Sequence, residues 1–414
     1  MKRRVVITGL GLTTPLGTGV EKTWDALCAG KSGVSRITRF DPSGMRTQIA
    51  AEIKDFHAED FIGNRKVARR TDRFQQFAMA VAQMAVADAG MEINHSNGTK
   101  IGVSMGTILG GLESLQVGHE QWLKGDVSQV SPFLVPMFMG NMGAAQIAME
   151  LGARGPNLAP NNACATGTYS VGEAFRLVQL GDVDAMIAGG SEAGIIPVII
   201  EGLSVMGAAS TRNDEPEKAS RPFDKDRDGL VAGEGAGAVV LEELNAALAR
   251  GARIYAEIIG FNANCDAYHL TSPSPGGEGA ARCMNLALQD AGTTPQDVDY
   301  INAHGTSTQY NDALETMAVK AVFGQHSKRL TMSSTKSMLG HTFAASGALE
   351  AVFTALTISK GLIPPTINQK TPDSDCDLDY VPNEARRAKV RVALSNSFGF
   401  GGTNSVVVFR EFDN

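Results

Sequence analysis

Aromatic side chains are scarce in this chain of 414 residues, which has only 2 tryptophans and an aromatic content of 6%. Apolar residues nevertheless make up 43% of the sequence, so aliphatic and small side chains must build most of the core. Charged residues account for 20%. This balance is typical of a folded globular protein, and it excludes a largely disordered chain.

Basic residues are in the minority, with 37 Lys and Arg against 44 Asp and Glu and a net charge of −7. A general nucleic-acid or anionic-membrane binder would normally be basic, so we expect neither partner. Long apolar runs are also missing. The nearest candidate, residues 133–149, contains Pro136, Gly140 and Asn141 and is short for a bilayer. It predicts a buried helix, with a second subunit as one candidate neighbour.

Cysteines are few, odd in number and far apart, and no CxxC pair occurs. They are Cys28, Cys164, Cys265, Cys283 and Cys376. This pattern fits neither a disulfide framework nor a zinc knuckle, and it favours the reducing cytoplasm. The first residues have basic side chains followed by only a short apolar run, so they predict a first strand rather than a cleaved signal peptide.

Short β-branched runs alternate with Ala-rich stretches of helical spacing, which predicts an α/β protein with buried strands. Helices are expected at residues 73–90 and 281–292, each ending in the letters DAG, because helices often end at glycine. Strands are expected at residues 4–9, 100–107, 184–190, 253–261, 299–306 and 390–402.

The strands and helices form two similar series, which predicts a structural duplication. Each series opens with an edge-like strand, carries a helix ending in DAG and closes on a glycine-rich strand end. We place the boundary near residues 245–253, which gives halves of residues 1–250 and 251–414. No low-complexity linker separates them, so we expect the halves to pack as one body.

Two motifs resemble ligand-binding loops, one for a dinucleotide and one for calcium, but each departs from its pattern at one essential position. GLGLTTPLG follows a strand as a dinucleotide-binding loop would, but Thr14 stands where the third glycine belongs. DKDRDGLVAGEG begins like a calcium loop at Asp224, but its twelfth residue is Gly235 instead of an acid. We therefore expect neither a nucleotide nor a calcium ion.

The segment NNACATGTYSVGEAF places Cys164 just before a run of helical spacing. A cysteine at a strand-to-helix turn lies at the positive end of the helix, which stabilises a thiolate. Taken alone, a buried structural thiol is the commoner explanation of such a cysteine. The other four cysteines lack this setting and keep that interpretation.

Two histidines strengthen the reactive interpretation of Cys164. His304 follows an apolar strand in INAHGTST, and His341 precedes an Ala-rich helix in SSTKSMLGHTFAASG, with Lys336 close by. Either histidine alone is more typical of a satisfied turn residue. Three reactive side chains at strand ends together predict a site that activates a thioester and stabilises an enolate.

These motifs, with NSFGFGGTN near the C-terminus, occur in the order found in one family. The chain resembles the type II β-ketoacyl-[acyl-carrier-protein] synthases of bacterial fatty-acid elongation, essentially from end to end. The resemblance implies a thiolase-like fold, with two duplicated halves in a five-layered αβαβα body. It also implies a homodimer that acts on acyl carrier protein, without a metal or a cofactor of its own, since the substrates carry phosphopantetheine on the carrier.

The resemblance assigns roles to the reactive residues. Cys164 would take the acyl chain, and its backbone N–H and that of Phe400 would form the oxyanion hole. Phe400 would also gate access to the nucleophile. His304 and His341 would stabilise the enolate left when malonyl thioester loses CO₂. Further implied roles are support of the histidines by Lys336 paired with Glu350, and binding of the pantetheine arm by Thr306 and Thr308.

By the same resemblance, Leu109 and Leu203 would line the acyl tunnel, and Phe133 would reach into it from the second subunit. A basic face with Lys66, Arg69 and Arg70 would dock the acidic carrier, although a solvated helix face explains these three residues as well. Departures from the family pattern are Ser128, Gln129 and Gly207 near the docking region, and Asn162, Gln309 and Phe343 near the chemistry.

None of these departures removes a reactive group, but they leave chain length and carrier identity open. A ketosynthase of a type II polyketide or polyene pathway is therefore an alternative. A non-catalytic subunit that sets chain length is less favoured because Cys164 is present. A thiolase acting on coenzyme A esters is disfavoured because NSFGFGG occupies the position of its second catalytic cysteine.

Overall fold

The computed structural model describes residues 2–413, and most of its strands join into one mixed sheet. In the first half of the chain these are β1 (Val5–Thr14), β2 (Gly17–Thr18), β5 (Ile101–Gly106), β6 (Asn157–Leu158), β7 (Ala185–Glu192) and β8 (Gly235–Glu243). In the second half they are β9 (Ala256–Cys265), β10 (Tyr300–Asn302), β11 (Thr331–Ser333), β14 (Val392–Gly399) and β15 (Thr403–Arg410). Small separate pairs are β3 (Val34–Arg36) with β4 (Ile49–Ala51), and β12 (Leu362–Ile363) with β13 (Arg386–Arg387).

The strand order confirms the expected duplication. The sheet runs β11-β10-β14-β15-β9-β1-β8-β7-β5-β6, so β1-β8-β7-β5-β6 has its counterpart in β9-β15-β14-β10-β11. In each half the first two pairings are antiparallel and the last two are parallel. The expectation of edge-like opening strands is wrong, because β1 and β9 pair with each other, with Val5 opposite Ile258. This pairing places both strands in the middle of the sheet.

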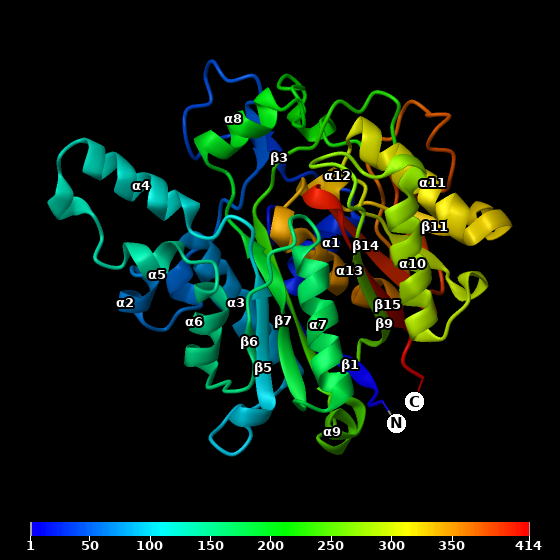
Figure 1. Ribbon diagram of the computed structural model, residues 1–414, viewed down its shortest axis with the longest axis horizontal. Helices are drawn as coiled ribbons and strands as arrows, with labels where there is room; N and C mark the ends of the chain where they lie inside the picture. The colour runs from blue at the N-terminus through cyan, green and yellow to red at the C-terminus, as the bar shows by residue number, and fades with distance from the viewer. Residues whose placement is uncertain (1, 414) are drawn as a thin grey trace.

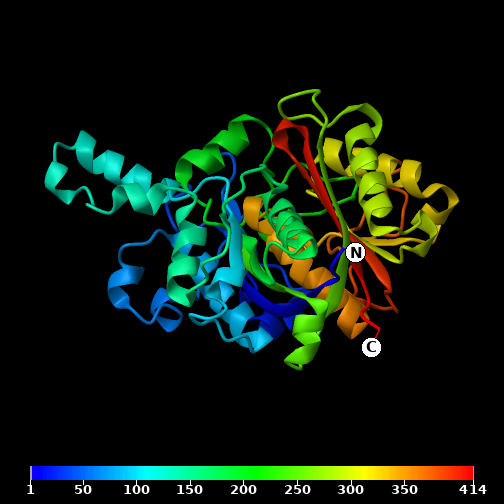
Figure 2. The same cartoon turned by 60° about the horizontal axis from the view of Figure 1, so that its bottom comes forward.

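The molecule has five layers in the order helices, strands, helices, strands, helices, as the family resemblance implied. The strands of each half form one of the two strand layers. Helices α7 (Thr166–Leu180) and α13 (Ser346–Lys360) lie in the centre and contact strands of both halves. Helix α3 (Arg73–Ala89) covers the outer face of the first half, and α10 (Glu278–Ala291), with α11 (Gln309–Phe323) beside it, covers the second. The strands of the two halves lie on either side of α7 and α13 in Figures 1 and 2.

Small residues bring the two central helices close together. A Cβ on Gly167 of α7 would lie 2.5 Å from the backbone nitrogen of Ala348, and one on Gly347 of α13 would lie 2.5 Å from that of Thr168. Such contacts leave no room for larger side chains. The low aromatic content is therefore consistent with the tight packing of this layer.

Glycines also explain the dinucleotide-like motif. A Cβ on Gly9 would lie 2.0 Å from the carbonyl oxygen of Ala85, and one on Gly11 would lie 2.0 Å from that of Val81. These glycines of β1 therefore allow α3 to pack directly on the sheet. The Asp224 carboxylate of the calcium-like motif accepts hydrogen bonds from the backbone N–H groups of Asp226, Lys370 and Thr371, so it joins two segments of the chain.

The segment 133–149 is not the single buried helix that its sequence predicts. It forms α5 (Leu134–Phe138) and α6 (Met142–Leu151), which are separated around Gly140. Val135 is 59% exposed. Helix α4 (Leu112–Leu123), which precedes this segment, extends away from the body in Figure 1. Helix α5 therefore has too few neighbours in one chain to bury its apolar side chains, whereas α6 packs on α3 and buries Ile147.

The remaining helices connect the strands at the surface or near the site. They are α1 (Val20–Cys28), α2 (Arg65–Ala68), α8 (Pro197–Val205), α9 (Leu244–Ala249) and α12 (Lys336–Leu339). None of the helices within residues 2–413 combines the length and the apolar character needed to span a bilayer.

Candidate active site

Cys164 lies in a tight turn between β6 and α7, as its sequence setting predicts. Ala163 has φ of 47°, a left-handed conformation that is strained for alanine. Thr166 fixes the turn, because its Oγ1 accepts from the N–H of Asn162 at 2.7 Å and donates to the carbonyl of Ala163 at 2.6 Å. Thr403 of β15 donates to the carbonyl of Asn162 at 2.9 Å. The turn is therefore held from both halves, with Cys164 9% exposed.

The GFGG segment approaches this turn closely. A Cβ on Gly399 would lie 3.0 Å from the backbone nitrogen of Cys164, so only glycine allows this approach. The backbone N–H groups of Phe400 and of Cys164 itself both act to lower the pKa of the Cys164 thiol. Gly401 and Gly402 follow with φ of 80° and 72°, and the Phe400 side chain is 40% exposed. Two backbone donors thus converge where an oxyanion would form on an acyl group bound to Cys164.

Burial raises the pKa of the Cys164 thiol to about 11, although the Lys336 charge and the N–H groups of Phe400 and Cys164 itself oppose this rise. The sequence-based expectation of a standing thiolate is therefore not met in the resting site. The group is a thiol at neutral pH, and its proton must leave when the sulfur attacks.

His304 is positioned by a buried carboxylate of α11. The Glu315 carboxylate accepts from the N–H of His304 at 2.9 Å and from that of Gly305 at 2.8 Å. Asn396 of β14 donates to the same carboxylate at 3.3 Å. Burial raises the pKa of Glu315 to about 7, while these donors oppose the rise. The loop after β10 is thereby anchored, and His304 is 2% exposed.

His341 is oriented through its Nδ1 atom. This nitrogen accepts from the N–H of Phe343 at 3.3 Å and lies 2.9 Å from Oγ of Ser346, the first residue of α13. A backbone N–H can only donate, so Nδ1 is the unprotonated nitrogen and Nε2 carries the hydrogen. Nε2 is buried without a hydrogen-bond partner among the described residues, as is Nδ1 of His304.

The two imidazoles lie together, with ring centroids 5.5 Å apart. Burial lowers the pKa of each well below 6.5, and the charge of Lys336 lowers both further. Both rings are consequently neutral at neutral pH. One neutral ring offers an N–H donor that no protein group uses, which suits it to bind a developing negative oxygen.

Lys336 links these groups. Its ammonium pairs directly with the Glu350 carboxylate, and both side chains are almost fully buried. Burial raises the pKa of Glu350 to about 7, with the Lys336 charge opposing the rise. The same ammonium acts on Cys164, His304 and His341. The structure therefore brings the predicted thiol, imidazoles and ammonium into one buried cluster.

Thr306 and Thr308 lie in the loop after His304, at the second and fourth positions beyond it. Their hydroxyl oxygens lie 2.9 Å apart, with Ser307 between them at φ of 69°. Thr306 is 6% exposed, whereas Thr308 is half-buried. Their proposed contact with a pantetheine arm stays a prediction.

The predicted acyl-pocket residues lie in two places. Leu203 packs on an apolar cluster that includes Phe343, and Leu109 contacts Gly194 beside the same ring. Phe133 lies elsewhere, at the start of α5, where the guanidinium of Arg70 stacks 4.3 Å from its ring centroid. The expected insertion of Phe133 into the pocket of a second subunit stays a prediction.

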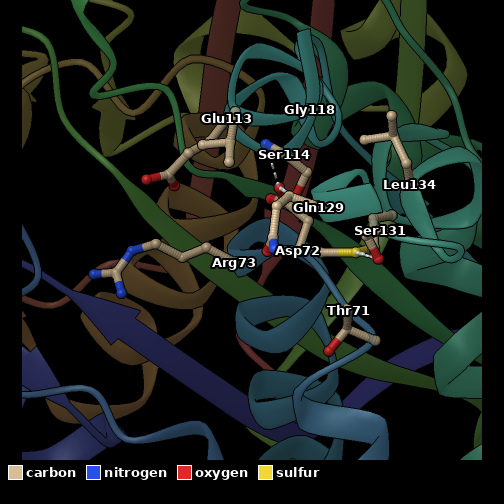
Figure 3. Close-up of a pocket in the computed structure, with 11 residues that line it drawn as sticks. Thr71, Asp72, Arg73, Glu113, Ser114, Gly118, Gln129, Ser131 and Leu134 are labelled. Carbon is tan, nitrogen blue, oxygen red and sulfur yellow. Dashed lines mark hydrogen bonds between the residues drawn. The ribbon is translucent and has the colours of Figure 1, made fainter. Parts of the chain in front are cut away.

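Lys66, Arg69 and Arg70 are all exposed on α2 and the turn after it. A separate cavity of about 280 Å³ opens nearby, between the start of α3, α4 and α5. Figure 3 shows that polar groups line it, with Ser114 donating to Asp72 at 2.5 Å. None of the reactive residues lines this cavity. It is distinct from the buried cluster.

Sequence reasoning missed three residues that hold the cluster in place: Glu315, Ser346 and Glu192. The Glu192 carboxylate accepts from Thr107 Oγ1 at 2.8 Å and from the N–H groups of Ile108 at 2.9 Å and Leu109 at 3.2 Å. Burial raises its pKa to about 7. For Glu192 the sequence did hold a signal. This acid ends the apolar strand AMIAGGSE, and a carboxylate buried there needs hydrogen-bond partners.

Comparison with known proteins agrees with this geometry. The family model of the β-ketoacyl synthase N-terminal domain matches residues 2–247, and that of the C-terminal domain matches residues 255–370. The chain is 50% identical over 411 residues to 3-oxoacyl-[acyl-carrier-protein] synthase 2 of Staphylococcus aureus, with 99% of each chain covered. It is 51% identical to the protein of that name from Coxiella burnetii, with 100% of each covered.

Solved structures show the same relationship. The ishigamide ketosynthase/chain length factor matches with a TM-score of 0.93 and 39% identity, with 100% of each chain covered. A type II polyketide ketosynthase in complex with its acyl carrier protein matches with a TM-score of 0.92 and 35% identity, again with 100% of each chain covered. The fold is the thiolase-like fold, and the chain belongs to the β-ketoacyl synthase family.

Proposed function

We propose that the protein is a 3-oxoacyl-[acyl-carrier-protein] synthase, an acyltransferase that lengthens acyl chains by two carbons in fatty-acid biosynthesis. The observation that carries this function is the single buried cluster of Cys164, His304 and His341. The centroids of the two imidazole rings lie 5.5 Å apart, and the segment 398–399 contacts both the ring of His304 and the turn of Cys164. The cluster combines a nucleophile beside two convergent N–H donors with two neutral imidazoles, which are the groups that a decarboxylative condensation needs.

The first half-reaction transfers the acyl chain to the enzyme. The Cys164 sulfur attacks the acyl thioester, the N–H groups of Cys164 and Phe400 bind the oxyanion, and the carrier thiol leaves with a proton. Because the resting sulfur is protonated, its proton passes to this leaving group, with a neutral imidazole as the available intermediate acceptor. Removing one such oxyanion donor typically costs about 3–4 kcal/mol in the transition state.

The second half-reaction forms the carbon–carbon bond. The malonyl thioester loses CO₂, and its carbonyl oxygen becomes an enolate that the Nε2–H of His341 and the ring of His304 stabilise. The enolate carbon attacks the acyl carbonyl on Cys164, and the carbon–sulfur bond breaks. The sulfur then takes up one proton, which returns the enzyme to its resting thiol. Thr306 and Thr308 are proposed to hold the pantetheine arm.

The proposed partner is an acidic acyl carrier protein, which supplies phosphopantetheine with each substrate. The exposed Lys66, Arg69 and Arg70 support this proposal by their charge, and one structural relative is a type II polyketide ketosynthase in complex with its acyl carrier protein. A homodimer in the cytoplasm is also proposed. The exposed apolar side chains of α5 support the dimer, because no residue of this helix is buried within one chain.

The fatty-acid pathway is preferred over a polyketide or polyene pathway. The sequence relatives at 50–51% identity carry the name 3-oxoacyl-[acyl-carrier-protein] synthase 2, whereas the polyketide ketosynthase structure is 35% identical. The presence of Cys164 argues against a non-catalytic chain-length subunit.

Reconstitution tests the proposal directly. The purified protein is incubated with malonyl carrier and with acyl carriers of graded chain length, and the products are identified by intact-protein mass spectrometry. The expected product is a 3-oxoacyl carrier two carbons longer than each accepted substrate. Condensation only with a carrier from a polyketide pathway would support the alternative, and the absence of any condensation with either carrier would contradict both.

A further inference from the structure

Phe343 connects the catalytic imidazole to the apolar pocket. Its ring is 8% exposed and faces the His341 ring, with centroids 5.3 Å apart and planes inclined by 29°. Its backbone adopts φ of 51°, a strained conformation for a residue with a Cβ. The N–H placed by this conformation donates to Nδ1 of His341. The strain is thus tied to the orientation of a reactive group.

The other edge of the Phe343 ring meets the acyl-pocket wall. A Cβ on Gly194 would lie 2.9 Å from Cδ1 of Leu109 and 3.3 Å from Cε2 of Phe343. The φ of Gly194 is not in the left-handed region, so glycine is required here for space and not for backbone conformation. Leu109 and Phe343 therefore approach one another over the Gly194 backbone, which leaves little room between them.

This narrow contact is held rigidly. The Glu192 carboxylate accepts hydrogen bonds from the backbone of the loop that carries Leu109, and the N–H of Ala344 also stabilises its charge. The Glu192 carboxylate thus fixes the chain at Leu109, and the hydrogen bond from the N–H of Phe343 to His341 fixes the chain at Phe343. A ring fixed in this way cannot move aside at low cost when a bulkier substrate enters.

We propose that Phe343 is a specificity-determining residue, which together with Leu109 forms an aromatic constriction at the reacting end of the acyl pocket. The constriction admits straight acyl chains and rejects chains that are branched next to the thioester. A branch at the first carbons adds a methyl group where the wall is formed by a flat, fixed ring. The inference rests on the proposed function, because that function places the acyl chain in this pocket.

The test measures loading of Cys164 in single-turnover experiments, by intact mass, with hexanoyl carrier and with 2-methylhexanoyl carrier. A single methyl group is discriminated by about 10- to 200-fold in apolar enzyme pockets, so wild type is expected to favour the straight chain by at least about tenfold. Phe343→Leu is expected to reduce this ratio several-fold. Phe40→Leu is the matched control, because Phe40 packs against the same apolar cluster, and it should keep the wild-type ratio.

A second variant tests the steric contact in the opposite direction. Gly194→Ala adds a Cβ at the constriction and should slow loading of both chains, and adding Phe343→Leu to that variant should restore loading of the straight chain. Normal loading in Gly194→Ala, or an unchanged ratio in a folded Phe343→Leu variant, would overturn this inference alone. Failure of wild type to load any straight chain would overturn the proposed function together with it.

Discussion

The rings of His304 and His341 meet edge to face, with their centroids 5.5 Å apart and their planes inclined by 84°. The two residues come from separate segments, one following β10 and the other preceding α13, and different groups fix each of them. Glu315 anchors the backbone of His304, whereas Ser346 and the N–H of Phe343 orient the ring of His341. The pair is thereby preorganised before any substrate arrives, which reduces the reorganisation needed during the reaction.

Replacing the nucleophile should separate the two half-reactions. Cys164→Ala removes the sulfur without adding bulk, so we expect no acyl-enzyme by intact mass and a melting temperature close to that of wild type. The imidazoles remain, so the variant should still release CO₂ from malonyl carrier. An acyl group found covalently on this variant would contradict the assignment of Cys164.

Decarboxylation should show no titration of the histidines between pH 7.5 and pH 6. Burial, followed by the Lys336 charge, lowers the pKa of both imidazoles well below 6.5, so both remain neutral throughout this range. The rate of CO₂ release by Cys164→Ala is the measurement, since no acyl step limits it.

Glu350 provides the control for this pH profile, because burial raises its pKa to about 7. If the rate of CO₂ release changes around pH 7 and this change disappears in Glu350→Gln, the titrating group is the Glu350 carboxyl group. Burial also raises the pKa of Glu315, which holds the backbone of His304, to about 7. A loss of rate centred near pH 6.5 that persists in both Glu350→Gln and Glu315→Gln would therefore contradict the neutral-imidazole assignment.

The buried Lys336–Glu350 pair should be costly to break. Lys336→Ala leaves a buried carboxylate without its partner, for which the free energy of unfolding typically falls by about 3–5 kcal/mol. This decrease in the free energy of unfolding, relative to wild type, should be larger at pH 8 than at pH 6. A carboxyl group whose folded pKa is raised contributes stability that is present at low pH and is lost as the pH rises through that pKa. Denaturant unfolding at the two pH values measures both effects.

Two further variants show whether the cost is specific to this pair. Arg282→Ala breaks an exposed pair with Glu278 on α10 and should cost under about 0.5 kcal/mol. Lys336→Met combined with Glu350→Leu should recover most of the stability while remaining inactive, because no charge is then buried alone. A single Lys336→Ala variant as stable as Arg282→Ala would show that the pair is not important for folding.

Sequence patterns were sufficient for the repeated order of strands and helices, and they selected Cys164, His304 and His341, whose catalytic roles stay a prediction. These features depend on local spacing and on short motifs that each lie within one segment. The pairing of β1 with β9 was missed because it joins residues more than two hundred positions apart, Val5 and Ile258, and no local pattern encodes that contact. The break of segment 133–149 had a local signal in Pro136 and Gly140, which the prediction of one helix underweighted. The exposure of Val135, in contrast, depends on neighbours that only three dimensions show.

The supporting acids show the same limit at the site. Glu315 and Glu192 each accept hydrogen bonds from backbone groups of other segments, so their roles arise from packing between elements. The thiolate expected for Cys164 was wrong because burial, which raises its pKa, outweighs the groups that lower it. Burial depends on the whole fold and could not be judged from one turn.

Charge reversal at the proposed docking face should slow association with the carrier. In Lys66→Glu combined with Arg69→Glu, the association rate should fall by about tenfold or more and become less dependent on salt, because exposed charges act mainly by steering. Arg70 is left unchanged, since its stacking on Phe133 would mix a packing change with the charge change. Stopped-flow binding of a labelled acidic carrier is the measurement.

The matched control reverses two exposed charges far from α2. Lys328→Glu combined with Arg329→Glu makes the same change in net charge at the end of the short helix that follows α11. Helices α11 and α2 lie at opposite ends of the molecule in Figure 1. This variant should bind the carrier nearly as fast as wild type. Equal slowing by both variants would indicate a response to net charge and would argue against a docking face.

Phe400 should control access to the nucleophile with little effect on stability. Its side chain is 40% exposed and is carried by a turn whose next two residues are glycines with φ of 80° and 72°. Exposed substitutions typically change the free energy of unfolding by within about 0.5 kcal/mol, so Phe400→Ala should unfold like wild type.

Without the Phe400 side chain, we expect malonyl carrier to be decarboxylated before Cys164 is acylated, which lowers the yield of condensed product per CO₂ released. Gly401→Ala acts in the opposite direction, because a Cβ strains the φ of 80° and should slow both acyl loading and CO₂ release. Acyl-transfer kinetics and product yields identical to wild type in Phe400→Ala would mean that the ring does not act as a gate.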